Sequence, residues 1–497
     1  MTEAKRNDEN RNLTGAFGAP VAALFCLFLA FALTGCTTLM NAGAVSPGDV
    51  IAGGEGLDSR FGSEEHPRIV AAYGGIYHDT KLEQTVARIV GRVVAASDKP
   101  DQSYRITILN APAINAFALP GGYLYVTRGL LALANNSSEV AAVLAHEMAH
   151  VTANHANARQ DKARTAMIVS RVVTDVLNDD DAGRLALASS ERSLASFSRQ
   201  QELEADALGV RTIGRAGYDP FAAARFLTAM RRFAAYRTAS SVLNDKRRDF
   251  LASHPTTPER IDFAVRAARQ FGAPGVGEID RDRYLAGIEG MVFGDDPSQG
   301  FVRERSFVHP TLGVGFTVPE GFVIDNASDA VLATGADGTA LRFDAVGLPV
   351  GADLGEYLAS GWVNGFLEGS VERFTVNGLP AASAVASAKG WAFRIAVVQV
   401  ETGATYRFIF ANEVDTARFS AAAKATVASF RKLDPAEAAK LNSLRIQLVT
   451  VKRGDTHKSL SRKMRGVDRP LELFRALNDL DPGSPLPAGM TVKVVAD

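Results

Sequence analysis

The most constraining feature of this chain is a helix-like stretch, residues 140–151, that carries two histidines four residues apart. Apolar residues recur along the stretch with the spacing of one helix face. On such a helix, His146 and His150 project from the same side about one turn apart, so both rings can bind one metal ion. Glu147 stands beside them and can reach a water at the metal without being a ligand. The stretch therefore predicts an amphipathic helix with a metal site.

The pattern His-Glu-x-x-His indicates a zinc site in which the glutamate acts as general base. Composition alone produces it in roughly one chain of this kind in a hundred, so its surroundings decide how much it means. Ser137 or Ser138 is a predicted N-cap, and Glu139 is favourable in the first helical turn. These start signals support a helix ahead of the two histidines.

A third metal ligand is expected from a second helix, because catalytic zinc keeps three protein ligands and one open position. Glu202 and Asp206 are four residues apart and share a helix face, whereas Glu204 points elsewhere. We expect Glu202 to bind the metal and Asp206 to accept a hydrogen bond from a ligand histidine, which orients its ring. The alternative is an acidic helix face in contact with solvent.

Together these two segments resemble the HtpX and BepA type of zinc metallopeptidase, relatives of the CAAX prenyl proteases. Residues 115–131 are similar to the family segment before the zinc helix, and His254-Pro255 with Arg260 resembles a downstream motif. The resemblance covers about residues 64–270. It implies a mainly helical, zincin-type domain of the gluzincin class, one Zn²⁺ per chain and endopeptidase activity.

The expected mechanism follows from these residues. Glu147 acts as general base on a zinc-activated water and returns the proton to the leaving amine. His254 either donates a hydrogen bond to the oxyanion or occupies the open zinc position and keeps the enzyme silent. A histidine that only packs before a proline turn is the alternative. Arg260 either supports the site or simply pairs with an acid.

A candidate substrate site precedes the zinc helix. Residues 115–119 lead into the turn at Gly121-Gly122, and an exposed edge strand there could pair with an extended peptide. On this hypothesis Asn115, Ala116 and Phe117 contact the substrate. The alternative is a core strand in which Asn115 only ends a turn.

Other histidines and one further helix are weaker candidates. His155 follows His150 by five residues and is expected to be rotated off the ligand face. Residues 165–177 are predicted to form a packed helix rather than a lid over the cleft. The histidines expected to be structural or on the surface are His66, His78, His309 and His457.

The N-terminus has the pattern of a bacterial lipoprotein signal, residues 1–35. The apolar run at 21–33 is too short for a spanning helix, and its ending resembles the lipobox, in which Cys36 is acylated. Thr37 follows the cysteine in place of Asp, which favours the periplasmic face of the outer membrane over the inner membrane. An ordinary signal anchor with a chance cysteine is the alternative.

Composition and cysteine count limit the remaining choices. The chain has 497 residues, 46% hydrophobic and 22% charged, with a formal net charge of -1. This is ordinary globular material without the basic surface that nucleic-acid binding needs. The two cysteines are Cys26 and Cys36, so a mature chain beginning at Cys36 has no pair to oxidise. The membrane is therefore expected to be an anchor site, not a solvent for the fold.

The chain divides at changes of composition, and the expected class is α+β. The expected segments are a signal peptide at 1–35, a tether at 36–63, a zinc metallopeptidase domain at 64–272, a linker at 273–302, an α+β domain at 303–434 and a small domain at 445–497. The 303–434 segment combines alternating strands with helices near 354–366 and 416–430, and is vaguely similar to PsbP-like domains. Its expected role is substrate or partner docking.

The last segment, 445–497, resembles a LysM module, which has the order βααβ and binds glycans that contain N-acetylglucosamine. Peptidoglycan is the expected partner. His457 stands where that family usually has an apolar residue. A purely structural βααβ cap is the alternative.

Two classes of function remain. The first is a membrane-anchored periplasmic zinc endopeptidase that hydrolyses unfolded, misassembled or immature envelope proteins. The second is a catalytically silent chaperone or peptidoglycan-binding scaffold lipoprotein with a structural or closed zinc site. An intact Glu147 favours the first class, because a structural site needs no base.

Overall fold

The computed structural model describes residues 55–156, 158, 198–240, 250, 254–327, 330–400, 403–467 and 469–497. The predicted signal peptide, Cys36 and the helix predicted at 165–177 lie outside these residues. The end of the predicted tether, from residue 55, belongs instead to helix α2 (Glu55–Ala72). The described residues mix helices and strands, as the α+β class predicts.

A three-stranded sheet precedes the metal-binding helix in the chain. It consists of β1 (Arg105–Leu109), β2 (Ala116–Leu119) and β3 (Tyr123–Thr127). Strand β3 is central and pairs with β1 in parallel and with β2 antiparallel, so β2 lies at one edge of this sheet. The strands predicted near 104–109 and 123–126 are therefore confirmed.

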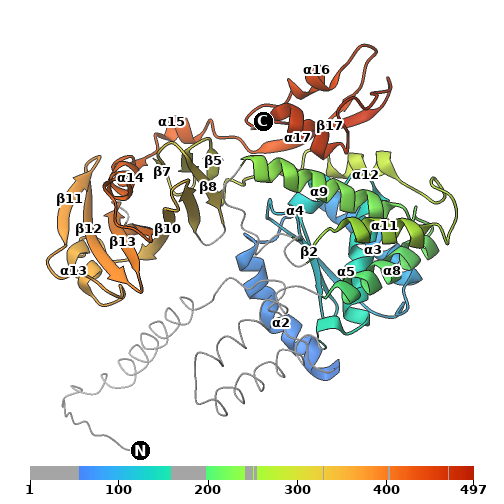
Figure 1. Ribbon diagram of the computed structural model, residues 1–497, viewed down its shortest axis with the longest axis horizontal. Coiled ribbons are helices and arrows are strands. Elements are labelled where there is room, and N and C mark those ends of the chain that lie inside the picture. The colour runs from blue at the N-terminus through green and yellow to red at the C-terminus, as the bar shows by residue number, and fades with distance from the viewer. Residues whose placement is uncertain are drawn as a thin grey trace, which may run out of the picture. The chain divides into compact units, whose positions relative to one another are not determined.

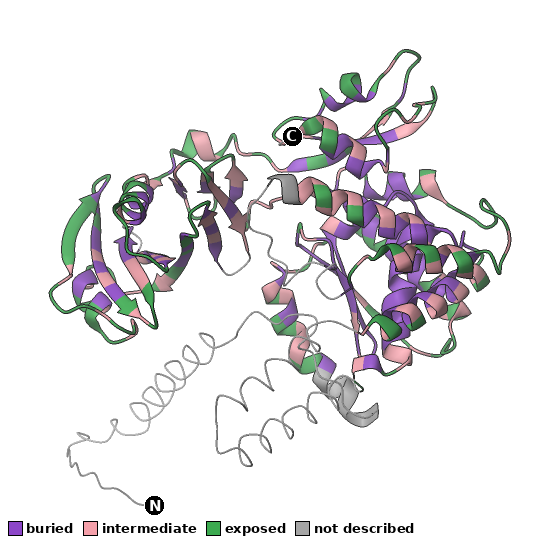
Figure 2. Cartoon of the chain, viewed as in Figure 1, coloured by how far each residue is buried: buried purple, intermediate pink, exposed green. Residues whose placement is uncertain are grey.

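Helix α5 (Ser137–Thr152) packs among the other helices of residues 80–268 (Figure 1). The helices of this region include α3 (Thr80–Ala96), α4 (Arg128–Leu133), α5 (Ser137–Thr152), α8 (Arg199–Arg215), α9 (Ala222–Ser240) and α11 (Pro258–Ala268). Every residue of α5 from Ser137 to His150 is buried, and α3, α8, α9 and β2 pack against it (Figure 2). The predicted helix is confirmed, but it is enclosed on all sides, whereas an amphipathic helix would expose one face.

The start of α5 differs from the prediction. Asn136 is the N-cap, and its side chain accepts a hydrogen bond from the backbone N–H of Glu139. The predicted cap at Ser137 or Ser138 is therefore wrong, because both hydroxyls donate outside the helix, to Asp280 and to backbone carbonyls. Glu139 is in the first turn as expected, and it accepts from the Asn135 N–H at 2.8 Å.

Helices α5 and α8 approach each other closely at Gly209. A Cβ at this position would lie 3.2 Å from the backbone nitrogen of His146 and 3.4 Å from its Cα. These atoms belong to a buried helix and cannot move aside as a flexible side chain can. Glycine therefore lets α8 carry its acidic residues up to the α5 histidines.

The 303–434 segment is built mainly from antiparallel strands. The seven-stranded sheet has the order β11-β12-β13-β14-β10-β9-β8, and a second sheet has the order β15-β7-β6-β5. The elements are β5 (Phe301–Arg303), β6 (Ser306–His309), β7 (Val314–Thr317), β8 (Phe322–Asn326), β9 (Val331–Gly335), β10 (Ala340–Gly347), α13 (Leu354–Ala359), β11 (Glu372–Val376), β12 (Leu379–Ala388), β13 (Trp391–Gln399), β14 (Ala404–Asn412), α14 (Ala417–Ala428), β15 (Arg431–Lys432) and α15 (Pro435–Ala438). The predicted helix near 354–366 is thus shorter than expected, while the one near 416–430 is confirmed.

The C-terminal segment has the predicted order of strand, helix, helix, strand: β16 (Leu444–Thr450), α16 (His457–Ser461), α17 (Pro470–Leu477) and β17 (Thr491–Ala496). Its sheet has a third strand, β4 (Val292–Phe293), which pairs with β16. The predicted linker at 273–302 therefore contains β4 and helix α12 (Arg281–Ile288). Buried residues of this segment, such as Val494, belong to the same hydrophobic core as helices α3 and α5, so the segment is not a separate unit.

Two buried basic side chains, Lys493 and Arg128, join these parts to α4 through hydrogen bonds to backbone carbonyls. Lys493 on β17 donates through Nζ to the carbonyl oxygens of Ala132, Leu133 and Ala134, at 2.7, 3.0 and 2.8 Å. Arg128 donates to the carbonyls of Val292 and Gly294 on and after β4.

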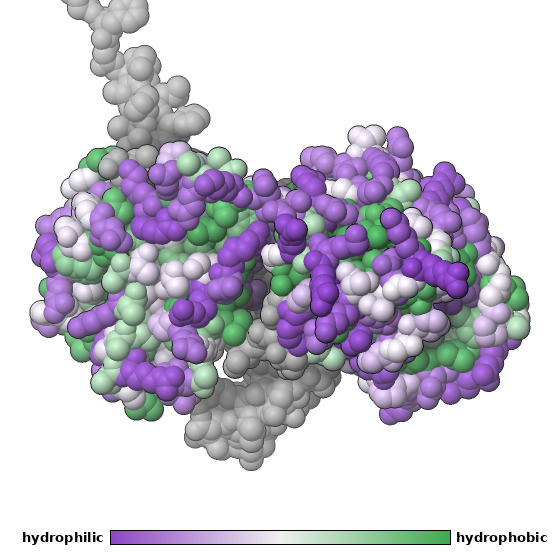
Figure 3. All heavy atoms as spheres, turned by 90° about the horizontal axis from the view of Figure 1, so that it is seen from above, coloured by the Kyte–Doolittle hydropathy of each residue, from purple (hydrophilic) through white to green (hydrophobic). Residues whose placement is uncertain are grey.

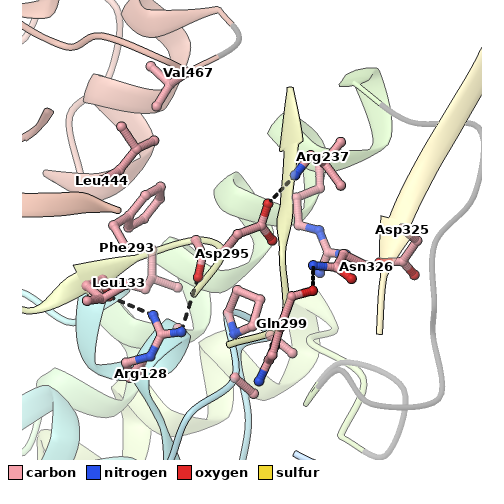
Figure 4. Close-up of a pocket in the computed structure, with 18 of the residues that line it drawn as sticks. Arg128, Leu133, Arg237, Phe293, Asp295, Gln299, Asp325, Asn326, Leu444 and Val467 are labelled. Atoms are coloured by element: carbon pink, nitrogen blue, oxygen red, sulfur yellow. Dashed lines mark hydrogen bonds between the residues drawn. The ribbon is translucent and has the colours of Figure 1, made fainter. Parts of the chain in front are cut away.

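A pocket of about 350 Å³ lies beside Arg128, and Figure 4 shows its lining. Leu133 of α4, Phe293 of β4, and Leu444 and Val467 of the C-terminal segment contribute to the wall. Residues from distant parts of the sequence thus line the same pocket.

The surface mixes polar and apolar side chains, and on the face seen in Figure 3 hydrophobic residues lie among hydrophilic ones. Within the described ranges, no helix combines the length and apolar character needed to cross a membrane.

The Lys493 contacts generate the first prediction. Replacing Lys493 by Met is expected to lower the free energy of unfolding by about 1.5–3 kcal/mol, because three buried carbonyls lose their donor. Lys452→Met is the matched control, since Lys452 is an exposed lysine of the same segment. Urea unfolding of the full chain measures both. Equal changes for the two variants would contradict a role for Lys493 in the core.

Candidate metal centre

The two histidines of α5 face each other across the predicted metal position. Their Nε2 atoms are 3.0 Å apart, and both side chains are buried. Glu202 comes from the first turn of α8, which starts at a capping box formed by Ser198 and Gln201. Its carboxylate lies 3.6 Å from His146 Nε2 and 3.5 Å from His150 Nε2. The structure therefore brings together the three residues predicted as ligands.

His254 adds a fourth donor to this group. Its Nδ1 atom is 2.9 Å from Glu202 Oε1 and 3.3 Å from His146 Nε2. One ligand atom from each of the four residues can be chosen so that all lie within 4.8 Å of one another. The ring of Phe250 stacks on His254, with centroids 4.4 Å apart, and holds it in place.

The spacing of these donor atoms fits zinc. Ligands about 2.0–2.1 Å from a tetrahedral zinc ion lie about 3.3–3.4 Å from one another. The four donors are separated by 2.9 to 3.6 Å along the contacts given above. Two neutral imidazole nitrogens at 3.0 Å cannot both present lone pairs without a cation or a proton between them. The residues present therefore fit one Zn²⁺.

Asp206 and Arg260 form the supporting layer. Asp206 Oδ1 is 3.0 Å from His146 Nδ1, which leaves Nε2 of that ring for the metal. Arg260 donates to both Asp206 oxygens at 2.8 Å and contacts Glu202 Oε2 at 2.5 Å. The sequence left open whether Arg260 supports the site or simply pairs with an acid. In the structure Arg260 pairs with Asp206 and also contacts Glu202, one of the residues predicted to bind the metal.

The charge of the site also favours a divalent cation. Three carboxylates, Glu147, Glu202 and Asp206, face one guanidinium, Arg260, so two negative charges remain when all are ionised. Burial works against the ionised carboxylates, but His254 and His146 outweigh it at Glu202 and lower the pKa of that carboxyl. Hydrogen bonds from Arg260 and His146 likewise lower the pKa of Asp206.

The pKa values of the two α5 histidines also favour a cation between their rings. Burial and the neighbouring His146 lower the pKa of His150 well below its usual value, so this ring is neutral and able to bind metal. At His146 burial also acts downwards, but hydrogen bonds to Asp206 and Glu202 dominate and raise the pKa to about 9. The cluster stabilises positive charge at the position between the rings, which a metal ion supplies in place of a proton.

Glu147 is positioned next to the ligands without belonging to them. Its side chain is buried, and its Oε1 atom is 3.7 Å from His254 Nε2. That oxygen has no hydrogen-bond partner in the described part of the chain. Burial raises the pKa of Glu147, against the effects of His254 and His146. A buried carboxylate with a free oxygen and a raised pKa is suited to accept a proton.

The predicted substrate residues occupy the edge strand and its start. Asn115 is fully buried, and its Nδ2 donates to the hydroxyl of Tyr73 at 2.8 Å. Phe117 stacks on Tyr125 with centroids 4.8 Å apart. The side chains of Asn115, Ala116 and Phe117 are thus buried. This agrees with the alternative that the strand belongs to the core and that Asn115 only ends a turn. Any contact with a substrate peptide is therefore left to main-chain groups.

Sequence reasoning missed two residues at this site, His155 and Glu204. His155 Nδ1 lies 2.8 Å from His150 Nδ1, although an ideal helix would rotate it away. Helix α5 ends before His155, and Asn154 adopts a left-handed φ of 53°, which returns the chain toward His150. Asn tolerates this conformation, but its presence alone could not have predicted the contact.

Comparison with known proteins agrees with this site. Residues 80–268 match Peptidase family M48. The beta-barrel assembly-enhancing protease of Escherichia coli (strain K12) is 30% identical over 220 residues, which cover 42% of this chain and 44% of that protein. The mitochondrial metalloendopeptidase OMA1 of Schizosaccharomyces pombe is 30% identical over 210 residues, which cover 41% of this chain and 59% of that protein. The chain spans about half the length of the curated relatives it matches.

The solved structure of PsbP from Synechocystis sp. PCC 6803 is 13% identical, covers 28% of this chain and 98% of its own, and has a TM-score of 0.21. That score is too low to assign a fold.

The helices, the buried donor set and the supporting carboxylate form a site that fits one zinc ion, within the residues that match Peptidase family M48. More narrowly, the chain is similar over part of its length to the beta-barrel assembly-enhancing proteases and to the OMA1 metalloendopeptidases.

The buried ion pairs generate the second prediction. Arg260→Met is expected to lower the free energy of unfolding by about 3–5 kcal/mol, because it leaves Asp206 and Glu202 buried without their cation. The comparison variant is Arg199→Met, which breaks the exposed pair with Glu259 and should change stability little. Urea unfolding with zinc content measured on the same samples tests this. Similar stability for the two variants would argue against the buried network.

Proposed function

We propose that this chain is a zinc endopeptidase in which Glu147 is the general base and His146, His150 and Glu202 are the metal ligands. The observation that carries the proposal is the buried Glu147 carboxylate, which has an unpartnered oxygen beside a donor set spaced for zinc. A purely structural site has no use for such a group.

Zinc, when bound, supplies Lewis acidity that polarises the scissile carbonyl and makes a water more acidic. Glu147 takes the proton of the attacking water and then delivers it to the leaving amine. Asp206 holds the His146 ring by its Nδ1 side, and Arg260 keeps Asp206 and Glu202 fixed. These contacts keep the ligands and the base in place during the reaction.

His254 is proposed to have a gating role. Its Nδ1 lies among the ligand atoms, at 2.9 Å from Glu202 and 3.3 Å from His146. From this position His254 would be a fourth ligand of a bound zinc ion, which supports the closed-site alternative over a donor to the oxyanion. On this view the structure corresponds to a silent form, and displacement of His254 opens the site to water and substrate.

The substrates are proposed to be unfolded, misassembled or immature envelope proteins. Main-chain pairing with the edge strand β2 would select extended peptides rather than one sequence. The bacterial relatives are named beta-barrel assembly-enhancing proteases, which supports a role at envelope proteins of that kind. Anchoring through a lipid on Cys36, on the periplasmic face of the outer membrane, follows from the lipobox-like ending of the N-terminal apolar run.

The C-terminal segment is proposed to bind peptidoglycan as a LysM-like module. The βααβ order supports this. His457 is buried and its Nε2 is 2.9 Å from the carbonyl oxygen of Ser484, so it replaces an apolar core residue with a hydrogen-bonded one. The competing function is a silent scaffold or chaperone, and the position of His254 is the observation that favours it.

The general base is tested with Glu147→Gln. Wild type should cleave casein, and the variant should lose at least about 10²-fold in rate because no carboxylate accepts the proton. Both proteins should hold one zinc per chain, measured by elemental analysis of the purified samples. Cleavage at the wild-type rate by the variant would rule out Glu147 as the base.

The gating role is tested with His254→Ala. This variant should cleave casein about tenfold faster than wild type, equivalent to about 1.4 kcal/mol, because the open position is no longer filled. His78→Ala serves as a control, since His78 is an exposed histidine that pairs with Glu83 and does not belong to the buried donor group. A rate below that of wild type, with zinc retained, would show that His254 assists the reaction instead. Silence of every variant on all unfolded clients would favour the scaffold function.

A further inference from the structure

His150 has a second contact on the side away from the ligand atoms. Its Nδ1 atom is 2.8 Å from Nδ1 of His155, and the two rings meet edge to face at 69° with centroids 4.9 Å apart. His155 Nε2 is 3.4 Å from Glu204 Oε2. A chain of three side chains thus runs from the ligand His150 through a buried imidazole to a half-exposed carboxylate.

The proton positions in this chain follow from the ligand role of His150. A histidine that binds metal through Nε2 carries its proton on Nδ1, so Nδ1 of His150 must donate. Nδ1 of His155 must then accept, which places the His155 proton on Nε2, directed to Glu204. The opposite assignment would put a proton on His150 Nε2, toward His146 Nε2 at 3.0 Å, and would block metal binding.

The main chain around His155 supports the same arrangement. The left-handed Asn154 turns the chain back after α5, and Gln201 of α8 donates its Nε2 to the carbonyl oxygen of His155 at 3.2 Å. Gln201 also belongs to the capping box that starts α8, the helix of Glu202. His155 therefore links the end of the histidine helix to the start of the glutamate helix.

We propose that His155, supported by Glu204, is a positioning residue that fixes the orientation and tautomer of His150 for metal binding. His155 contacts the Nδ1 atom of His150, just as Asp206 contacts the Nδ1 atom of His146, and in each case the contact leaves Nε2 for the metal. The two supports differ in one respect: Asp206 is a buried carboxylate held by Arg260, whereas the support of His150 is a neutral ring whose carboxylate is half exposed. This inference rests on the proposed zinc endopeptidase, because it assigns a residue to the same metal site.

The test measures zinc affinity rather than proteolysis, by competition with a chromophoric chelator in the full chain. His155→Leu keeps a buried apolar side chain but removes the acceptor, and it should weaken zinc binding about 10–100-fold. His155→Asn places an amide oxygen near the same position and should restore affinity to within about threefold of wild type. Glu204→Gln should weaken binding by less than His155→Leu, since Glu204 acts through His155.

Two controls separate positioning from general stability. His66→Leu removes a histidine that bonds to the Tyr125 hydroxyl away from the site, and it should leave zinc affinity unchanged. Urea unfolding of the zinc-free proteins should show similar stability for His155→Leu and His155→Asn, and the visible absorption of the cobalt(II)-substituted proteins should change for the Leu variant alone.

Wild-type affinity in a folded His155→Leu chain would overturn the proposal and leave the peptidase function intact. Equal weakening by Leu and Asn would overturn it too, because the acceptor would then not matter. If wild type itself bound no zinc, the proposed function would fail along with it.

Discussion

The close contact of α8 with α5 is the constraint on which the rest of the site depends. Gly209 allows the two helix backbones to approach until a Cβ would nearly touch His146, and this brings Glu202 and Asp206 level with the histidines. The approach places several carboxylates in a buried space, which is stable only if cations offset them. Arg260 supplies one such charge, and the donor spacing indicates that zinc supplies the rest. Packing and metal binding are therefore parts of one arrangement.

Buried basic side chains also connect parts of the chain outside the metal site. Lys493 and Arg128 are buried basic side chains that donate mainly to backbone carbonyls, and they join the C-terminal segment and β4 to helix α4. Helix α4 is followed directly by Asn135 and Asn136, which bind and cap the start of α5. The C-terminal segment is thus connected to the N-terminal end of α5 through a short series of hydrogen bonds. Its proposed glycan binding would occur on a body that is continuous with the peptidase core.

Local patterns in the sequence predicted the centre of the site well. His146, Glu147 and His150 lie on one helix, so their relation depends only on helical geometry. Glu202 and Asp206 were assigned correctly as neighbours for the same reason, although their distance from His146 required the fold. The N-cap was misassigned because Asn136 and the serines after it are all good capping residues, and only the contacts of the serines with residues 278–280 decide between them. The linker was misassigned because the two-residue strand β4 is too short to give an alternating pattern.

The sequence by itself therefore placed His146, Glu147 and His150 together on one helix and Glu202 with Asp206 on another, since each relation follows from residues within one or two turns. Only the tertiary structure decided that His254 stands among the ligand atoms, that Phe250 stacks on it, and that Arg260 bridges Asp206 and Glu202. It also placed His155 off the ligand face, as expected, but in contact with the Nδ1 atom of His150, which helical spacing does not predict. These contacts join residues from different elements, or residues across a helix end, where the periodicity of a single helix no longer predicts the direction of a side chain.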